Sequence, residues 1–215
     1  MITLKTNYPL AIESNDYLCP HGTRRDNSTN KRFNKKLYKL FPSNSPIKIL
    51  DLGCSGGGFI QSVIEDGYIG VGLEGSDWSK NLGRGAWSKI PTLFTADITK
   101  PFNILLNDKH LNFDVITSFE VFEHLKMMEL GQTIKNMIGH LTQGGIIILG
   151  ISTAEEVIND VVLHHTVKPL EWWEEKFLTY GLVRRKDVEK YFGKQYLRQD
   201  PESFYFVLQY VKYAK

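Results

Sequence analysis

The chain has 215 residues, 42% of them hydrophobic, which is enough for one well-buried domain and too short for two of ordinary size. Its 26 Lys and Arg residues against 24 Asp and Glu leave a net charge of +2, so no global field attracts nucleic acid, and its two cysteines fit a reducing compartment. No apolar run approaches the ~18 residues of a membrane span and the N-terminus lacks a signal-peptide core, so we expect a cytoplasmic protein without membrane contact.

The N-terminal region divides into an arm and a helix. Residues 1–20 have little periodicity and end at Cys19-Pro20, which predicts an extended arm. After a polar stretch rich in turn formers, a helix should begin behind Asn30, a good N-cap, because apolar residues recur at helical spacing at Phe33, Leu37, Leu40 and Phe41. Residues 21–40 contain seven Lys or Arg and one Asp, a composition that suits a solvated surface.

The most informative stretch runs from Ile49 to Phe59. A short apolar run ending in Asp51 predicts a buried strand, and four glycines within six residues then allow a tight turn against a ligand before a helix begins. The turn has no lysine, which excludes a phosphate-binding P-loop. It matches the dinucleotide fingerprint only in part, because Ser55 stands at the third place. The segment therefore indicates a nucleotide-type site of another kind.

Strands and helices alternate beyond this turn. A second strand ends in Glu74, 21 residues after Gly53, where a carboxylate can accept both hydroxyls of a ribose. Largely apolar runs predict a parallel sheet buried on both faces, with strands at 47–52, 69–74, 92–96, 113–118 and 145–151. Helices are expected at 126–141, with Met127 and Met137 in the core, and from Pro169 to Gly181. A last pair of strands is predicted at 182–190 and 203–211.

Five segments resemble the class I S-adenosylmethionine-dependent methyltransferases, in particular those of small molecules. They are DLGCSGGGF (51–59), GLEGSD (72–77), TADIT (95–99), FDVITSFEVFEHL (113–125) and LTQGGIIIL (141–149), in the order and spacing of that family. The one departure is Ser55, where the family most often has glycine. The resemblance implies an α/β fold: a single Rossmann-like, doubly wound sheet, mostly parallel, with an antiparallel hairpin at its C-terminal edge. It also implies an N-terminal arm and lid helix at 1–42 and the methyltransferase domain at 43–215.

The resemblance makes S-adenosylmethionine the expected cofactor. Because the carboxyl ends of parallel strands meet at one edge, residues that follow different strands should converge on one crevice. By resemblance, Gly53 and the turn to Gly57 face the methionine part, Glu74 binds the ribose, and Asp97 with Ile98 contacts the adenine. The full set expected at the cofactor is Asp51, Gly53, Cys54, Ser55, Gly56, Gly57, Glu74, Gly75, Asp97, Ile98 and Phe119.

Histidines and acids near the same edge are candidates for chemistry. A hydroxyl acceptor needs a base, and an imidazole with an ordinary pKa near ~6.5 can take a proton at neutral pH. We predict His165 as the base, with His124 as the alternative or relay and Glu120 beside them; His164 continues an apolar run and is expected to be packed. Residues 21–40 have a second interpretation besides a solvated surface. Since similar methyltransferases carry a lid before the core, this basic segment could close over the site and supply His21, Arg24 and Arg25 to the substrate.

The pattern Glu120-x-x-Glu123-His124 with a later histidine, taken as His165, also resembles the metal site of small-RNA 3'-end 2'-O-methyltransferases. The same pattern occurs in metal-free small-molecule methyltransferases, so we expect no metal. The leading prediction is O-methylation of a small polar acceptor such as a sugar or sugar-nucleotide intermediate, without nucleic acid as a partner. The alternatives are an RNA 2'-O-methyltransferase with a divalent metal and a non-catalytic cofactor-binding regulator. The sequence does not predict the oligomeric state.

Overall fold

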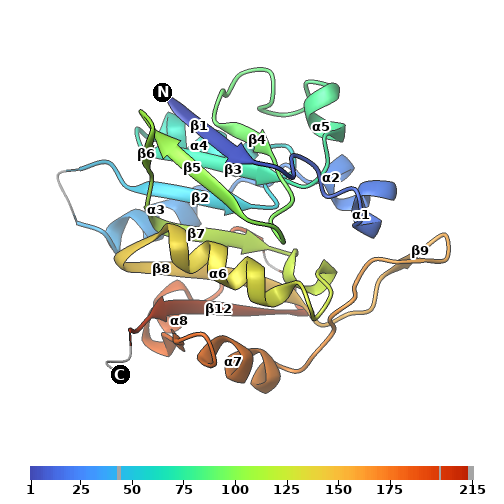
Figure 1. Cartoon of the computed structure of the whole chain (residues 1–215). Coiled ribbons are helices and arrows are strands. Elements are labelled where there is room, and N and C mark those ends of the chain that lie inside the picture. The colour runs from blue at the N-terminus through green and yellow to red at the C-terminus, as the bar shows by residue number, and fades with distance from the viewer. Residues whose placement is uncertain (43–44, 199, 213–215) are drawn as a thin grey trace.

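A seven-stranded sheet forms the centre of the computed structural model, which describes residues 1–42, 45–198 and 200–212 (Figure 1). The strand order is β11-β12-β8-β7-β2-β3-β4. The strands are β2 (Lys48–Leu52), β3 (Ile69–Glu74), β4 (Leu93–Thr95), β7 (Phe113–Phe119), β8 (Leu141–Ser152), β11 (Leu182–Arg184) and β12 (Ser203–Tyr210). The five predicted core strands are all present, and the registers of β2, β3, β4, β7 and β8 are parallel.

The C-terminal edge of the sheet is antiparallel, as predicted. β12 pairs antiparallel with both β8 and β11. The strand predicted at 182–190 is wrong in its second half, because β11 ends at Arg184 and a helix, α8 (Lys186–Phe192), takes its place. Phe192 is fully buried, and the Arg184 guanidinium donates to both carboxylate oxygens of Glu189, which fastens the first turns of this helix to the strand.

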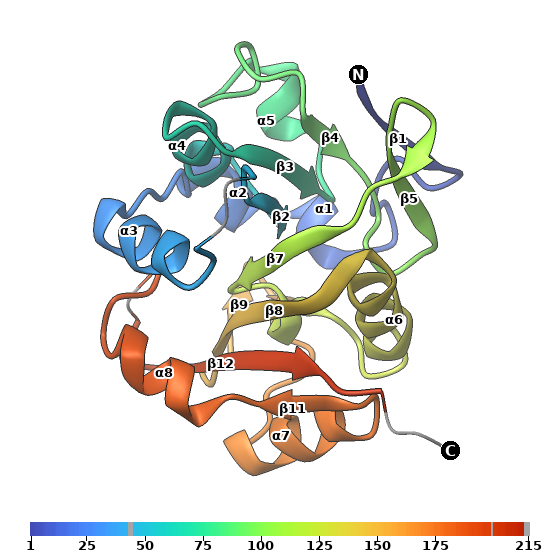
Figure 2. The same ribbon diagram turned by 90° about the vertical axis from the view of Figure 1, so that its left-hand side faces the viewer.

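Helices cover both faces of the sheet (Figure 2). On one face lie α6 (Leu130–His140) and α7 (Leu170–Leu178), whose apolar residues form one hydrophobic cluster with the strands. On the other face lie α3 (Lys31–Lys39), α4 (Gly58–Glu65) and α8, which form the second cluster. This doubly wound arrangement places the carboxyl ends of the parallel strands along one open edge.

The helix predicted at 126–141 is shorter at its start. α6 begins at Leu130, after the 3-10 helix η1 (Phe122–His124), and the Glu129 carboxylate accepts from the backbone N–H of Lys126. Met127 therefore precedes the helix and is exposed, which corrects its predicted place in the core. Met137 is buried as expected.

The N-terminal arm is more ordered than its sequence indicates. β1 (Ile2–Thr6) pairs antiparallel with β5 (Phe102–Leu106), which also pairs with β6 (Lys109–His110), and the three form a second sheet. Two unpredicted short helices follow, α1 (Asn15–Leu18) and α2 (His21–Arg25). The predicted helix after Asn30 is α3, and the Asn30 side chain accepts from two backbone N–H groups of its first turn.

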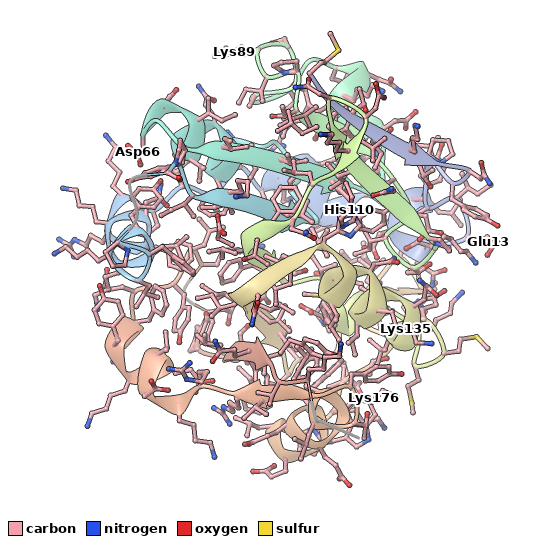
Figure 3. The ribbon with its side chains drawn as sticks, turned by 60° about the vertical axis from the view of Figure 1, so that its left-hand side comes forward. Glu13, Asp66, Lys89, His110, Lys135 and Lys176 are labelled. Atoms are coloured by element: carbon pink, nitrogen blue, oxygen red, sulfur yellow. The ribbon has the colours of Figure 1, made fainter. Side chains whose placement is uncertain are left out.

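Some further features bear on the sequence predictions. The expected boundary between 42 and 43 falls beside residues 43–44, outside the described residues. The remaining elements are α5 (Trp78–Asn81) and the pair β9 (Val157–Ile158) and β10 (Val161–Val162), which projects beyond the sheet (Figure 1). Within the described ranges, no helix has both the length and the apolar character needed to cross a bilayer. Of the lysines labelled in Figure 3, Lys89 lies at one end of the molecule, and Lys135 and Lys176 lie towards the other.

Candidate active site

The glycine turn after β2 is held tightly against the rest of the protein. The backbone N–H groups of Gly53 and Cys54 both donate to the carbonyl of Leu73, at 2.8 and 3.0 Å. Gly53 has a φ of +78°, and a Cβ placed on it would collide with Val121. Gly57, at φ +76°, is the N-cap of α4. The turn therefore needs glycine for its own backbone and for close packing, whatever ligand it contacts.

One cavity lies at the carboxyl ends of the parallel strands, where the sequence predicts the cofactor. It is lined by seven of the predicted cofactor residues: Gly53, Ser55, Glu74, Gly75, Asp97, Ile98 and Phe119. The other four do not line it: Asp51, Cys54, Gly56 and Gly57. Cys54 is buried against Gly72, Gly57 against Leu93, and Gly56 beneath Asn27. Residues from strands far apart in sequence thus converge as the parallel topology requires, while the inner part of the turn is covered by protein.

Asp51 is one of the residues behind the cavity wall. It is 5% exposed, and its Oδ1 accepts from the hydroxyl of Thr117 at 2.7 Å. Burial raises the pKa of Asp51 to about 7, although the Thr117 hydrogen bond lowers it. A carboxyl group at this place is therefore close to half-protonated at neutral pH.

Glu74 faces the cavity and is already hydrogen-bonded on both oxygens. Its Oε2 accepts from the backbone N–H of Ser55 at 2.7 Å, and its Oε1 accepts from the Thr23 hydroxyl at 3.1 Å and from the Ser76 N–H at 3.3 Å. Burial raises the pKa of Glu74, and these hydrogen bonds lower it. A carboxylate has about four acceptor positions, so room is left for hydroxyl donors from a ligand.

The N-terminal segment lies against the glycine turn. The carbonyl of Thr23 accepts from the hydroxyls of Ser55 and Ser79 and from the guanidinium of Arg84. The carbonyl of Asp26 accepts from Ser55 and from the same guanidinium, at 2.8 and 2.7 Å. Arg84 therefore holds α2 at its middle, through Thr23, and at its C-cap, Asp26. The same helix contributes Gly22 and Thr23 to the cavity wall.

A second cavity adjoins the first. Its lining includes Glu120, His124 and Arg198, which also line the first cavity, and His21 and Arg25 from α2. Two of the three residues predicted to bind the substrate thus face this space. The third, Arg24, lines neither cavity, because its guanidinium lies over the ring of Trp78, 5.4 Å from the centroid.

The three candidate histidines occupy different positions. His165 lines the first cavity, and its Nε2 is buried without a hydrogen-bond partner among the described residues. His164 lines the second cavity, where its Nδ1 lies 2.6 Å from the carbonyl of Ala154. Its Nε2 lies 3.3 Å from Glu156. His124 lines both cavities, and its Nδ1 lies 3.0 Å from Oδ1 of Asp16.

Two glutamates complete the cluster. Glu120 has a φ of +55° and accepts from the Ser203 hydroxyl at 2.9 and 3.0 Å, and burial raises its pKa. Glu123 is fully buried, and neither of its carboxylate oxygens has a hydrogen-bond partner in the described part of the chain. Burial raises the pKa of Glu123 as well, so its neutral form is favoured.

Donor atoms of Glu123, His124 and His164 lie within 4.8 Å of one another and could hold a metal ion. This group differs from the one that the sequence resemblance implies, because His164 takes part where His165 was expected and Glu120 is bonded to Ser203. Both imidazoles already have a carboxylate partner, Asp16 or Glu156. The two imidazoles are therefore as well suited to share protons with these carboxylates as to bind a metal ion.

The residues that the sequence did not indicate are Asp16, Thr23, Arg84 and Arg198. Each lies outside the motifs, and Arg84 acts on residues about 60 positions away in the chain. Only Asp16 has a local signal, since Ser14 precedes it as an N-cap and accepts its N–H. Short capped turns of this kind are too common to identify a site.

Comparison with known proteins places the chain in a family. A family model described as a methyltransferase domain matches residues 24–200. The chain belongs to this methyltransferase domain family. The family and the mostly parallel α/β fold that the sequence motifs imply are thereby confirmed. A search of curated proteins finds no match.

Solved structures similar to this methyltransferase share its fold at low sequence identity. The PH0226 protein from Pyrococcus horikoshii OT3 is 16% identical, with a TM-score of 0.58, covering 91% of this chain and 99% of that one. The DhpI-SAM-HEP complex is 12% identical, with a TM-score of 0.59, covering 95% and 100%. The glycopeptide N-methyltransferase MtfA with sinefungin is 11% identical, with a TM-score of 0.56, covering 84% and 93%.

Proposed function

We propose that this methyltransferase transfers the methyl group of S-adenosylmethionine to a hydroxyl of a small polar acceptor, such as a sugar or sugar-nucleotide intermediate. The observation that carries the proposal is the junction of the two cavities. The first holds the acidic strand ends Glu74 and Asp97, and the second is lined by charged side chains. Glu120, His124 and Arg198 belong to both, so a methyl donor in one can meet an acceptor in the other.

The cofactor is S-adenosylmethionine, which the family of this chain and its structural neighbours both support. DhpI and MtfA, which share the fold, are crystallised with S-adenosylmethionine, S-adenosylhomocysteine or sinefungin. In this chain we assign the ribose hydroxyls to Glu74 and the adenine to Asp97 and Ile98, with Phe119 beside them. Gly53 and Ser55 border the same cavity where the methionine part would lie.

The methyl transfer is a direct displacement that needs no covalent bond between the protein and either reactant. The bond between the methyl carbon and the sulfonium sulfur breaks as the bond to the acceptor oxygen forms, and the thioether S-adenosylhomocysteine leaves neutral. The hydroxyl proton passes to a base, for which His124 and His165 are the candidates. Alignment of the two reactants can supply ~7–11 kcal/mol of the barrier in favourable systems. Holding both ligands at the junction is therefore the main task of the site.

The second cavity favours a polar acceptor. It offers donors in Arg25 and Arg198 and acceptors in acids of several segments, namely Glu120, Glu155, Glu156 and Asp200. Such mixed walls suit a ligand with several hydroxyls. The possible metal group of Glu123, His124 and His164 is the observation that keeps an RNA 2'-O-methyltransferase as the second candidate. The net charge of only +2 does not favour it.

The test is an unbiased search for the acceptor. Cell extract is separated into small molecules and RNA, and each fraction is incubated with enzyme and methyl-labelled S-adenosylmethionine. We expect label in a small molecule, and NMR should place the methyl group on oxygen. The control is Glu74→Ala, which should lower labelling because it removes the proposed ribose contact. Label only in RNA, or on nitrogen, would contradict the proposal.

A further inference from the structure

We propose that Asp16 on α1 is a positioning residue that fixes His124 as the general base of methyl transfer, so that the base is complete only when α1 is seated. This inference rests on the proposed O-methylation. The inference goes beyond the proposed function because it chooses His124 over His165 as the base and because it gives a role to a residue of the N-terminal segment. Asp16 also lies outside the residues 24–200 that the family model matches.

Asp16 and His124 are in close ion-pair contact. The Oδ1 atom of Asp16 lies 3.0 Å from Nδ1 of His124. The contact is an ion pair and not an aligned hydrogen bond, because Nδ1 of His124 has no hydrogen-bond partner among the described residues. A carboxylate this close still favours a proton on Nδ1, which leaves Nε2 as the nitrogen that can act as the base. Nδ1 is buried, while the His124 side chain as a whole is 17% exposed, so the exposed part is the remainder of the ring. That remainder is what the ring can offer to the cavities that His124 lines.

His124 is better placed for an acceptor than the other two histidines. It lines both cavities, whereas His165 lines only the first and His164 only the second. Its backbone N–H donates to Val121, whose side chain covers Gly53 of the glycine turn. The base is therefore built into the same wall as the cofactor turn. Among the described residues, no carboxylate is in ion-pair contact with His165, and its buried Nε2 has no hydrogen-bond partner.

α1 has its own anchors. Ser14 caps the helix by accepting the backbone N–H of Asp16 at 3.2 Å, and its hydroxyl lies 3.4 Å from Oδ2 of Asp16. The amide of Asn15 donates to the carbonyl of Val162 in β10 at 2.7 Å. Asp16 therefore presents one oxygen to Ser14 and the other to His124. Movement of α1 away from β10 would separate Asp16 from the imidazole.

The charges around His124 agree with this role. Burial lowers its pKa, but the nearby carboxylate of Asp16 more than offsets this, and the pKa is raised to about 9. Asp16 is the largest favourable contributor. The other titratable groups that face His124 come from η1, the strand end before it and the β9 region: Glu123, Glu120, Glu156 and His164. Removal of the Asp16 charge should therefore lower the pKa of His124.

The step balances without any further reactant. The acceptor hydroxyl gives its proton to Nε2 of neutral His124 as its oxygen takes the methyl group from the sulfonium. The products are the methyl ether, S-adenosylhomocysteine and an imidazolium. Asp16 stabilises the positive charge that forms on the ring, and the proton then leaves to water. Since the base must be neutral, the rate should rise with pH towards about 9 in the wild type.

The experiment compares Asp16→Asn and Asp16→Glu with the matched control Asp108→Asn, an exposed acid in the β5–β6 turn. We expect Asp16→Asn to lower kcat about 10- to 100-fold with cofactor affinity within about twofold, and to move the rise of the pH–rate profile to lower pH. Asp16→Glu should recover part of kcat. His124→Ala should lose about 10²- to 10⁴-fold, and the double variant should lose no more than His124→Ala alone.

NMR titration of the labelled His124 ring supplies a readout that needs no acceptor. Its pKa should fall in Asp16→Asn and stay unchanged in Asp108→Asn. If the ring titration shifts as expected but the product carries the methyl group on nitrogen, the proposed function fails while the pairing stands. An unchanged titration in Asp16→Asn would overturn the proposal. So would additive losses in the double variant, or a loss of cofactor affinity as large as the loss of kcat.

Discussion

Single residues at the strand ends combine deep burial with charge, and Asp51 is the clearest case. Its carboxyl group keeps its proton up to about pH 7 in the folded chain, against 3.8 for the free side chain. The folded state therefore binds this proton more tightly than the unfolded state does. Protonated Asp51 therefore contributes to the free energy of unfolding. This contribution is complete below pH 3.8 and is lost as the pH rises to about 7.

Asp51→Asn removes this titration while retaining an oxygen for the Thr117 hydroxyl. The free energy of unfolding of Asp51→Asn, measured relative to the wild type, should rise by roughly 1.4 kcal/mol per pH unit between pH 5 and 7 and then level off. Urea denaturation without ligand, at pH 5, 6, 7 and 8, measures it. Asp108→Asn should show no such trend. A constant difference across the series would mean that Asp51 is ionised throughout.

Chelation tests whether the histidine cluster holds a metal ion. Glu123 favours its neutral form because it is buried, His124 is paired with Asp16, and His164 has contacts on both ring nitrogens. We therefore expect dialysis against EDTA to leave turnover within about twofold, and metal analysis of the purified protein to find less than one ion per chain. Activity that disappears and returns with manganese, cobalt or magnesium would contradict this and favour the RNA alternative.

Gly53 shows how far a residue can be predicted. Sequence spacing correctly indicated a position where a side chain is excluded, and attributed this to a ligand. The structure adds Val121, which a Cβ on Gly53 would strike, and a φ of +78°. Val121 is 68 residues away in the chain, so no local pattern could reveal the contact. A bulky substitution at Gly53 is therefore expected to disturb folding as well as binding.

At the scale of elements, predictability follows the strength of the periodic signal. The five parallel strands are continuous apolar runs, and α3, α6 and α7 have clear apolar faces. α1 and α2 contain only 4 and 5 residues, too few to show a period. α8 was taken for strand because it follows directly on β11. These three helices are held by distant side chains, which the sequence does not place.

Arg84 is one of these distant anchors, and its removal should loosen α2. Arg84→Ala deletes hydrogen bonds to the carbonyls of Thr23 and Asp26. A hydrogen bond that involves a charged group typically contributes about 1.5–3 kcal/mol to the free energy of unfolding. We expect faster amide exchange at residues 21–26 and about 10-fold weaker cofactor binding. Arg32→Ala, an exposed position on α3, is the control. Unchanged exchange at 21–26 would show that α2 is held by other contacts.

At the scale of the molecule, residues 1–42 are joined to the core at several places. β1 adds to β5, Ala11 donates to the carbonyl of Gly75, and Phe33 of α3 packs against Phe119 and Phe192. These contacts favour one packed unit on both sides of the division that the sequence predicts at 42/43. We expect the described parts of the chain to unfold together.

A thermal scan with S-adenosylhomocysteine tests this unity and the cofactor site at once. A ligand at 100 times its Kd adds about 2.7 kcal/mol to the free energy of unfolding, which for a chain of this size corresponds to a rise in Tm of about 5–11 °C. One transition should move as a whole, because the ligand site is walled by α2 as well as by the sheet edge. Glu74→Gln, which loses the charge of the proposed ribose contact, should bind about 10- to 100-fold more weakly and shift less at the same concentration. Two transitions, with only the second moving, would show instead that the N-terminal region folds apart from the cofactor site, and the seating of Asp16 beside His124 would then need a separate cause.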